Sequence, residues 1–307
     1  MTKRFPFPVP NGWFMVAYDD EVPPQGVLPL HYFGKDLVLY RTASGRAQAH
    51  DAFCAHLGAH LGHGGRVEGE DLVCPFHGWR FGTDGRCKAV PYAKRIPPQA
   101  QLRVWPTVED SGMVFVWHHA QGAAPSYDPP HVPEWGQPDW EPWQRFRWQV
   151  RSASQEIIEG AVDNAHFPYV HKNEGMPGME IEFDGPFLRT RSSLHLPEGP
   201  TRMHVHFYGI GAGVGRKWGL GDVAFIGTET PIDDETVDFR FSLMKKRTDA
   251  GDPSGGMAQF YIDEIARGVG EDIPIWENKG FQPKPMLCDG DGPVPQYRRW
   301  ASQFYCE

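Results

Sequence analysis

The amino-acid sequence predicts an α+β protein, in which an all-β module is followed by a largely antiparallel sheet with helices packed against it. Up to about residue 118, short runs of β-branched and aromatic residues alternate with Gly, Pro and Asp turn signals. A helical pattern follows residue 150, and longer strand patterns precede a second helical pattern. Strands grouped apart from helices are typical of this class. The length of 307 residues fits about two domains.

Residues 1–118 are expected to form the all-β domain. Its strand patterns carry β-branched and aromatic residues and lie at Trp13–Tyr18, His31–Arg41, Ala47–Phe53, Cys87–Val90 and Met113–Trp117. Turn signals at 83–85 and 110–112 precede the last two of these patterns. Residues 119–150 then change in composition, because prolines recur through them, and they are expected to form an extended, proline-rich connector.

Residues 151–307 are expected to form the second domain, which begins with a helix. Apolar residues recur at helical spacing over 157–165. Ser152 or Ser154 can cap the start of this helix, and Pro168 ends or kinks it. Strand patterns follow at Met179–Phe183, Phe187–Leu196, Arg202–Tyr208, Asp222–Thr230 and Thr236–Lys245. Two further helices are expected, over residues 254–270 and over Val294–Tyr305.

Composition and charge exclude several classes of protein. The net charge is −9 and no run of Lys or Arg is present, so nucleic-acid binding has no electrostatic basis. No apolar stretch approaches the about 18 residues that span a bilayer, and the N-terminus lacks the apolar segment of a secretory signal. Five cysteines, an odd number, favour a reducing cytoplasmic location over a disulfide scaffold. The 11 Trp and 19 Phe predict an aromatic core or pocket.

Cysteine and histidine recur twice within one short segment, as Cys54-x-His56 and Cys74-x-x-His77, each followed by a glycine. Two thiolates with two imidazoles form the ligand set of a Rieske [2Fe–2S] cluster, in which the cysteines hold one iron and the histidines the other. The same four side chains can hold a structural zinc ion. Zinc ribbons usually pair C-x-x-C knuckles, so the observed spacing favours the cluster.

A second pair of candidate metal ligands, His166 and His171, lies in the first helical segment of the second domain. Asp163 precedes His166 by one helical turn, where its carboxylate can accept a hydrogen bond from a histidine ring nitrogen. Pro168 interrupts the helix, so that His171 can turn toward His166. A Rieske cluster transfers single electrons, and the usual destination is an Fe(II) held by two histidines and one carboxylate.

The order of these motifs resembles the α subunit of Rieske non-haem iron oxygenases, and the resemblance covers both halves of the chain. It implies a helix-grip, START-like catalytic domain whose mononuclear Fe(II) is held by His166, His171 and a downstream aspartate. In this family that aspartate precedes an Arg-rich C-terminal helix, which favours Asp291 over Asp289. The resemblance also implies a homotrimer in which electrons cross between neighbouring chains, with Asp163 bridging a cluster histidine and an iron histidine.

The same resemblance predicts a terminal oxygenase that uses O2 and electrons from a separate NAD(P)H-dependent reductase, with or without a ferredoxin. No G-x-G-x-x-G nucleotide motif is present in the chain itself. The stretch 291–305 is most similar to 3-ketosteroid 9α-hydroxylases and sterol-oxidising relatives, which favours monooxygenation of a bulky, hydrophobic, polycyclic or steroid-like substrate. The alternatives on the same scaffold are O- or N-demethylation of an aromatic compound and ring dihydroxylation.

Two hypotheses from other classes also account for part of the sequence. A Rieske electron carrier needs only the first 120 or so residues, and a zinc-stabilised, START-like protein would hold a lipid without chemistry. Positions 59 and 76 are Ala and Phe, whereas high-potential Rieske proteins carry a cysteine pair there, so the resemblance implies a low-potential cluster. Glu159 stands where many family members have Asn, and His204 and His206 are expected to line a pocket or to pack. His60 and His63 are expected to be loop residues and not ligands, and Cys87 an ordinary buried residue. Trp79 is expected to shield the cluster or to belong to the core.

Overall fold

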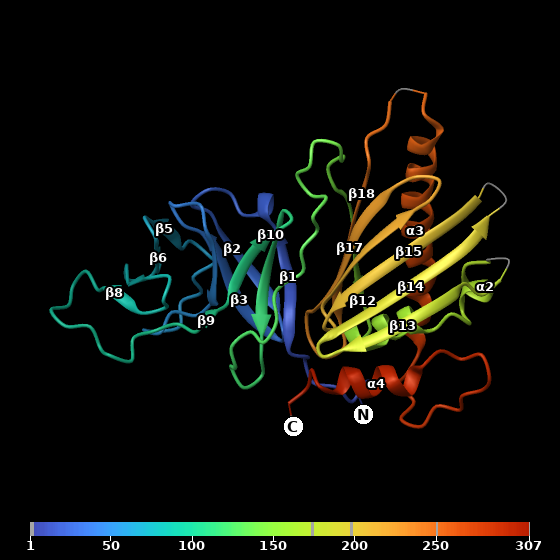
Figure 1. Ribbon diagram of the computed structural model, residues 1–307. Coiled ribbons are helices and arrows are strands. Elements are labelled where there is room, and N and C mark those ends of the chain that lie inside the picture. Colours follow the sequence, from blue (N-terminus) through green and yellow to red (C-terminus); the bar gives the residue numbers. More distant parts are fainter. Residues whose placement is uncertain (1–2, 173–174, 197–198, 250, 307) are drawn as a thin grey trace.

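The computed structural model describes residues 3–172, 175–196, 199–249 and 251–306. Figure 1 shows two parts side by side: small sheets formed by the first third of the chain, and one large sheet with the long helix α3 (Pro253–Asn278) against it. Antiparallel sheets dominate both parts, which confirms the predicted α+β class. Among the described residues, no helix combines the length and the apolar character needed to cross a bilayer.

The first domain consists of a three-stranded sheet in the order β1-β11-β10 and two four-stranded sheets, β2-β3-β4-β9 and β5-β6-β7-β8. Its elements are β1 (Gly12–Tyr18), η1 (Asp19–Glu21), β2 (Val27–Tyr32), β3 (Lys35–Arg41), β4 (Ala47–Asp51), β5 (Arg66–Glu68), β6 (Asp71–Val73), β7 (Arg80–Phe81), β8 (Cys87–Ala89), β9 (Val104–Trp105), β10 (Thr107–Asp110) and β11 (Met113–His118). The single strand predicted over His31–Arg41 is wrong, because Phe33 and Gly34 both have positive φ (59° and 65°) and turn the chain into a hairpin.

The second domain is built on a seven-stranded antiparallel sheet in the order β12-β18-β17-β16-β15-β14-β13. Its strands are β12 (Gln144–Val150), β13 (Gly178–Asp184), β14 (Phe187–Leu196), β15 (Gly199–Tyr208), β16 (Ala212–Trp218), β17 (Val223–Pro231) and β18 (Val237–Lys245). Residues 144–150 therefore belong to the sheet and not to the connector predicted over 119–150. Strand β16 was not predicted, because Gly213 and Gly215 weaken its strand pattern.

The helices differ from the prediction mainly at their ends. They are α1 (Ser154–Glu159), the short 3-10 helix η2 (Gly160–Val162), α2 (Phe167–Val170), α3 and α4 (Val294–Ser302). Neither Ser152 nor Ser154 caps α1, since the N-cap residue is Ala153 and the Ser154 hydroxyl donates to the Glu229 carbonyl oxygen (3.0 Å). Pro168 lies in the first turn of α2, where its missing N–H costs nothing, and so does not end a helix there.

Helix α3 lies along one face of the seven-stranded sheet (Figure 1). Its apolar side packs Tyr261, Ile262 and Val269 against sheet residues such as Phe225 and Phe239. The opposite face of the sheet packs against the first domain, and the shared apolar core contains Trp13, Met15, Phe115, Trp117, Val214, Ala224, Ile226 and Met244. The sheet is therefore covered on both faces.

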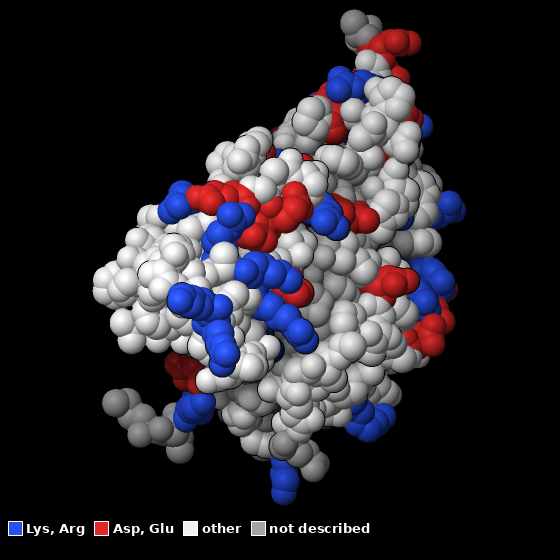
Figure 2. All heavy atoms as spheres, turned by 90° about the vertical axis from the view of Figure 1, so that its left-hand side faces the viewer, with Lys and Arg blue, Asp and Glu red and all other residues white. Residues whose placement is uncertain are grey.

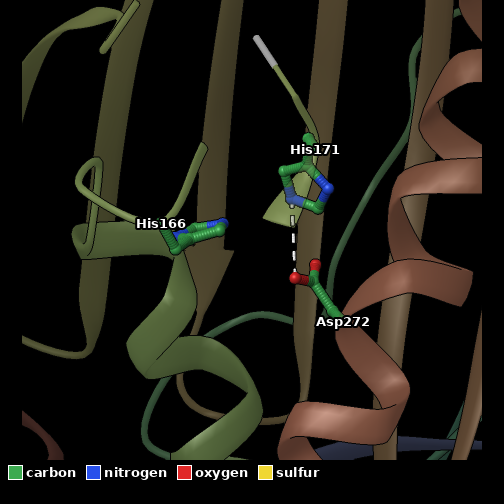
Figure 3. Close-up of side chains that lie close together, drawn as sticks. All are labelled: His166, His171 and Asp272. Atoms are coloured by element: carbon green, nitrogen blue, oxygen red, sulfur yellow. Dashed lines mark ion pairs between the residues drawn. The ribbon is translucent and has the colours of Figure 1, made fainter. Parts of the chain in front are cut away.

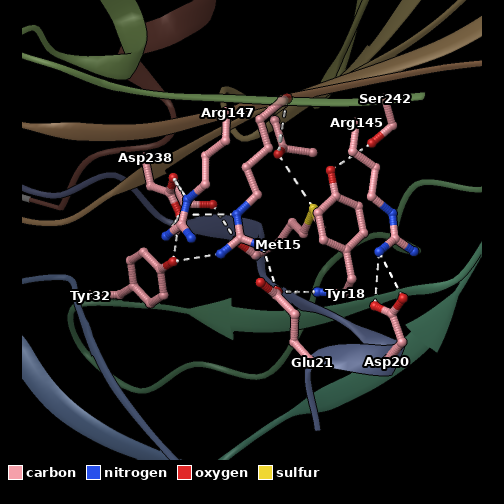
Figure 4. Close-up of polar contacts among 12 residues, drawn as sticks. Met15, Tyr18, Asp20, Glu21, Tyr32, Arg145, Arg147, Asp238 and Ser242 are labelled. Atoms are coloured by element: carbon pink, nitrogen blue, oxygen red, sulfur yellow. Dashed lines mark hydrogen bonds and ion pairs between the residues drawn. The ribbon is translucent and has the colours of Figure 1, made fainter. Parts of the chain in front are cut away.

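A buried network of charges also joins the two domains (Figure 4). Asp238 on β18 accepts hydrogen bonds from Arg147 (2.8 and 3.0 Å), from Arg240 (3.0 Å) and from the Tyr32 hydroxyl (2.5 Å). Arg240 also donates to Glu21 (2.7 Å) in the first domain. Burial acts to raise the pKa of Asp238, but the hydrogen bond from Arg147 and the charge of Arg240 lower it below its usual range.

We expect Asp238→Asn to destabilise the fold by about 3 kcal/mol, because Arg240, only 3% exposed, would keep its charge and lose a buried partner. The pair of Arg145 and Asp20 lies at the same boundary but is 35% and 63% exposed. Asp20→Asn is therefore expected to cost less than about 1 kcal/mol. Thermal unfolding followed by circular dichroism measures both variants, and equal effects would contradict the role given to the buried network.

Candidate metal centres

Two loops of the first domain present the Cys and His ligands with the same backbone geometry. The loop at Cys54 follows β4, and the loop at Cys74 follows β6. Each cysteine N–H donates to the carbonyl oxygen five residues later (2.9 and 2.8 Å), and Gly58 and Gly78 donate back to the cysteine carbonyls (3.0 and 3.1 Å). Both glycines have positive φ, 72° and 71°, so the glycine after each histidine allows the chain to close the loop.

The side chains of these loops fit an iron–sulfur cluster. Cys54 and Cys74 are buried free thiols, and the ring centroids of His56 and His77 lie 4.8 Å apart. The Nδ1 atoms of both histidines are buried without a hydrogen-bond partner, which is costly unless another group binds them. The ring of His56 stacks on Trp79 at 4.6 Å, so this indole covers one side of the ligand set.

The geometry favours two metal ions over one at these loops. Among the described residues, one group of candidate ligands has all its ligand atoms within 4.8 Å of one another, and it consists of His166, His171 and Asp272. The loop ligands do not form a second group by this criterion. A structural zinc ion requires all four ligands around one point at about 2.0–2.3 Å. A Rieske cluster divides its ligands between two irons, so it does not have this requirement.

His166, His171 and Asp272, here called the metal group, lie between helix α3 and the segment 163–171 around α2 (Figure 3). His166 precedes α2, His171 follows it, and Asp272 projects from α3. The His171 Nε2 atom lies 3.5 Å from the Asp272 carboxylate, and the two histidine ring centroids lie 5.1 Å apart. Two histidines and one carboxylate with open positions are typical of mononuclear non-haem Fe(II) sites.

Two further carboxylates orient the histidine rings. Glu271 lies 3.0 Å from the Nδ1 atom of His171, and Asp163 lies 3.6 Å from the Nδ1 atom of His166. A proton on each Nδ1 leaves the Nε2 atom free to bind a metal ion. Interaction with His166 lowers the pKa of the Asp163 carboxyl, whereas burial raises the pKa of Asp272. A bound dication would stabilise the charged form of Asp272.

The structure does not bring Asp291 or Asp289 to this group. Both residues are exposed in the loop before α4, and the Asp291 carboxylate accepts a hydrogen bond from the Cys288 N–H (2.7 Å). Asp272 lies beside the two histidines, where Asp291 was expected. It was missed because the predicted helix ended at residue 270, eight residues before the observed end. The spacing of Val269, Asp272 and Trp276 on one helix face was the signal that could have identified it.

A cavity of about 510 Å³ lies between α3 and the sheet, and all three members of the metal group lie on its wall. Most of the lining is apolar, from Ile157, Met203, Val205, Phe207, Phe225, Phe239, Phe241, Ile265 and Val269. His204 and His206 alternate with the lining residues of β15 and face away from the cavity. Their rings pack against Trp218 (4.6 Å) and Phe187 (5.1 Å), so they pack and do not line the pocket.

Other residues singled out in the sequence have structural partners. Glu159 accepts a hydrogen bond from Arg298 (2.7 Å), which ties α1 to α4, and lies 3.6 Å from Lys279. His60 accepts a hydrogen bond from the Gly62 N–H within its own loop (3.1 Å). The rings of His60 and His63 lie 4.5 Å apart.

Comparisons with known proteins match both domains of the chain. A family model of the Rieske [2Fe-2S] domain matches residues 12–106, and a model of the 3-ketosteroid 9α-hydroxylase C-terminal domain matches residues 116–305. A probable 3-ketosteroid-9-alpha-monooxygenase oxygenase component from Rhodococcus rhodochrous is 35% identical over 301 residues, which cover 90% of this chain and 74% of the relative. A cholesterol 7-desaturase from Xenopus laevis is 31% identical, covering 99% and 74%.

Solved structures share the fold. Dicamba monooxygenase bound to dicamba aligns with a TM-score of 0.76 and 18% identity, covering 96% of each chain. NdmA of Pseudomonas putida CBB5 aligns with a TM-score of 0.77 and 19% identity, covering 95% of this chain and 89% of that one. At this identity the likeness concerns the fold alone.

We expect Asp272→Ala to remove mononuclear iron and to leave the two cluster irons in place, because the third ligand is lost while the distant loops are unchanged. Asp291→Ala is the matched control and is expected to keep all iron. Metal analysis together with the electron paramagnetic resonance signal of the reduced cluster measures both. Loss of mononuclear iron in Asp291→Ala, with retention in Asp272→Ala, would restore the assignment made from sequence.

Proposed function

The chain belongs to the Rieske oxygenases, in the family of the 3-ketosteroid 9α-hydroxylase oxygenase components, and from this membership we propose that it hydroxylates a steroid-like substrate. Its cofactors are a Rieske [2Fe–2S] cluster and mononuclear iron. The observation that carries the proposal is the large, mainly apolar cavity with His166, His171 and Asp272 on its wall. A bulky hydrophobic molecule fits such a chamber, and the relatives are named for steroid and sterol substrates.

When bound, the two metal centres supply single electrons and O2 activation, and the chain supplies geometry and exclusion of water. Cys54, Cys74 and the two loop histidines hold the cluster. His166, His171 and Asp272 hold the iron, with Glu271 and Asp163 orienting the rings. The apolar wall binds the substrate and keeps bulk water away from the reacting carbon.

We also propose that electrons pass between chains of a homotrimer. The β5–β8 sheet, which carries the second cluster loop, lies at the opposite end of the molecule from α2 and α3 (Figure 1). Leu57 and Phe76 on the two cluster loops are 66% and 60% exposed, so an apolar surface surrounds the cluster ligands. Contact of this end with the iron side of a neighbour is heterologous. Such contacts form a closed trimer when each copy is rotated by one third of a turn relative to the next.

A separate reductase is proposed as the source of electrons, because the relatives are named as oxygenase components. Figure 2 views the molecule from the first-domain end and shows Lys and Arg side chains gathered on this face, bordered by acidic ones. Arg86, Lys88, Lys94 and Arg95 are exposed in the segment after the second cluster loop. An acidic surface on the reductase, or on an intervening ferredoxin, would complement this end of an otherwise acidic chain.

The competing hypotheses account for less of the molecule. An electron carrier needs only the first domain and gives no role to the metal group on the cavity wall. A zinc-stabilised lipid carrier likewise gives no role to that metal group, and the relatives are named as oxygenase components. Demethylation and dihydroxylation remain distinct outcomes of the same chemistry and are separated by product mass.

The proposed activity is tested with the purified holoenzyme, a surrogate reductase, NADH, O2 and androst-4-ene-3,17-dione. We expect a product that has gained one oxygen atom, identified by mass spectrometry with ¹⁸O2 as the label. Addition of two oxygens and two hydrogens, or loss of a methyl group from a methoxy- or N-methylarene in a parallel screen with no steroid product, would contradict steroid monooxygenation.

Asp163→Ala is expected to leave both metal centres bound and to abolish coupled turnover, because it removes the proposed bridge between His166 and a cluster histidine of the neighbouring chain. Asp289→Asn, an exposed aspartate in the loop before α4, serves as the control and should retain full activity. Product formed per NADH consumed, together with iron content and cluster spectrum, measures the effect. Full product formation by Asp163→Ala would rule out the bridging role.

A further inference from the structure

Strand β17 places one acidic side chain in the wall of the cavity. Phe225, Gly227 and Glu229 alternate along the strand and line the cavity, whereas Ala224 and Ile226 face the first domain. Glu229 is only 4% exposed. Its main chain is fixed by the sheet and by a hydrogen bond from Ser154 to its carbonyl oxygen (3.0 Å).

Glu229 differs from the other acidic groups of the cavity in having no cationic partner. Glu156 lies 3.1 Å from Lys279, and the other carboxylates of the lining likewise pair with Arg, Lys or His side chains. Within the described part of the chain, no ion pair involves Glu229, and its Oε2 atom is buried without a hydrogen-bond partner. An unsatisfied buried polar atom costs about 1–3 kcal/mol, so its presence calls for a function.

The chemistry of this carboxyl is that of a hydrogen-bond donor. Burial raises the pKa of Glu229 to about 8, so the neutral acid predominates at pH 7. A neutral carboxylic acid in an apolar chamber can donate its O–H to an acceptor on a ligand. Among the described residues no cation pairs with Glu229, so the charge of a negatively charged ligand group beside it would not be compensated.

Aromatic rings pack on the sheet beside the carboxyl. Gly227 pairs in register with Gly213 across β16 and β17, and both line the cavity. A Cβ atom on Gly227 would lie 2.8 Å from the Phe241 ring and 3.6 Å from Glu229 Oε1. A Cβ atom on Gly213 would likewise lie 2.7 Å from the Phe207 ring. The rings of Phe241 and Phe207 therefore cover the two glycines, and the cavity wall beside Glu229 is aromatic.

Glu229 also lies at the metal end of the cavity. It pairs in register with Phe239, whose ring contacts Trp276 at 5.8 Å. Trp276 follows Asp272 by about one turn of α3. Lys217 is a second polar group of the sheet wall, and its ammonium group lies over the Tyr261 ring at 4.1 Å. Tyr261 precedes Asp272 by about 16 Å along the axis of α3.

We propose that Glu229 is the polar anchor for the substrate, and that its carboxyl donates a hydrogen bond to the ketone oxygen of a steroid-like molecule. This inference rests on the proposed function and adds a positioning residue to it. An anchor in the cavity that also contains the metal ligands determines which carbon of a rigid polycycle lies next to the iron. Glu229 is therefore expected to control both the preference for ketones and the site of hydroxylation.

The test compares ketones with the matching hydrocarbon on the holoenzyme. The ligands are 5α-androstan-3-one, 5α-androstan-17-one and 5α-androstane, and binding is measured by equilibrium dialysis with mass spectrometry. Glu229→Leu is expected to weaken the binding of the preferred ketone roughly 3- to 10-fold and to leave the affinity for 5α-androstane unchanged. Glu229→Gln keeps an N–H donor and should remain close to the wild type. Thr228→Val, one residue earlier on the opposite sheet face, is the control.

The cluster spectrum and the iron content confirm that each variant is folded. The inference is overturned if the wild type binds neither ketone more tightly than 5α-androstane. It is also overturned if Glu229→Leu binds the ketone as tightly as the wild type does, or if this substitution lowers the affinity for all three ligands equally. Turnover of the same ligands separates this inference from the proposed function. A wild type that binds ketones through Glu229 but oxidises none of them would refute the steroid activity alone. Steroid oxidation without a Glu229 effect would refute the anchor alone.

Discussion

The position of both domains depends on the seven-stranded sheet, whose two faces are both covered. Strand β17 shows this most clearly, because all nine of its residues are buried. One face packs against the first domain through a shared apolar core, and the other faces α3 and the cavity. Alternate residues of one strand therefore face in two directions: one set packs against the first domain, and the other lines the cavity. The cluster-bearing domain and the catalytic cavity are held in a fixed relation by the same sheet.

The metal site depends on where α3 lies on that sheet. The helix supplies Asp272 and Glu271 as neighbours in sequence, one toward the metal and one toward the His171 Nδ1 atom. Residues 163–171, which include α2, supply both histidines and Asp163, whose carboxylate lies 3.6 Å from His166 Nδ1. Apolar packing of α3 on the sheet thus sets the position of Asp272 relative to His166 and His171, and all three side chains lie on the wall of the cavity between helix and sheet.

The sequence predicted the parts of the site that are local. The cluster loops are two short segments with complete ligand motifs, and His166 and His171 lie within one segment. The third metal ligand could not be located in this way, because it meets the histidines only through tertiary packing, and Gly268, Gly270 and Pro274 obscured the continuation of α3. Glycines likewise concealed β16, and the proline-rich composition before β12 concealed its alternating pattern. Glu229 carried no motif, since its role depends on which face of β17 the cavity occupies.

The central claim is that one chain carries two metal centres, with Asp272 completing the second. Anomalous diffraction at the iron edge from crystals of the holoenzyme tests it most directly. The account predicts two iron peaks between the loops at Cys54 and Cys74, and a third peak bonded to His166, His171 and Asp272. A single metal between the loops, or a third iron bonded to Asp291 in place of Asp272, would contradict it.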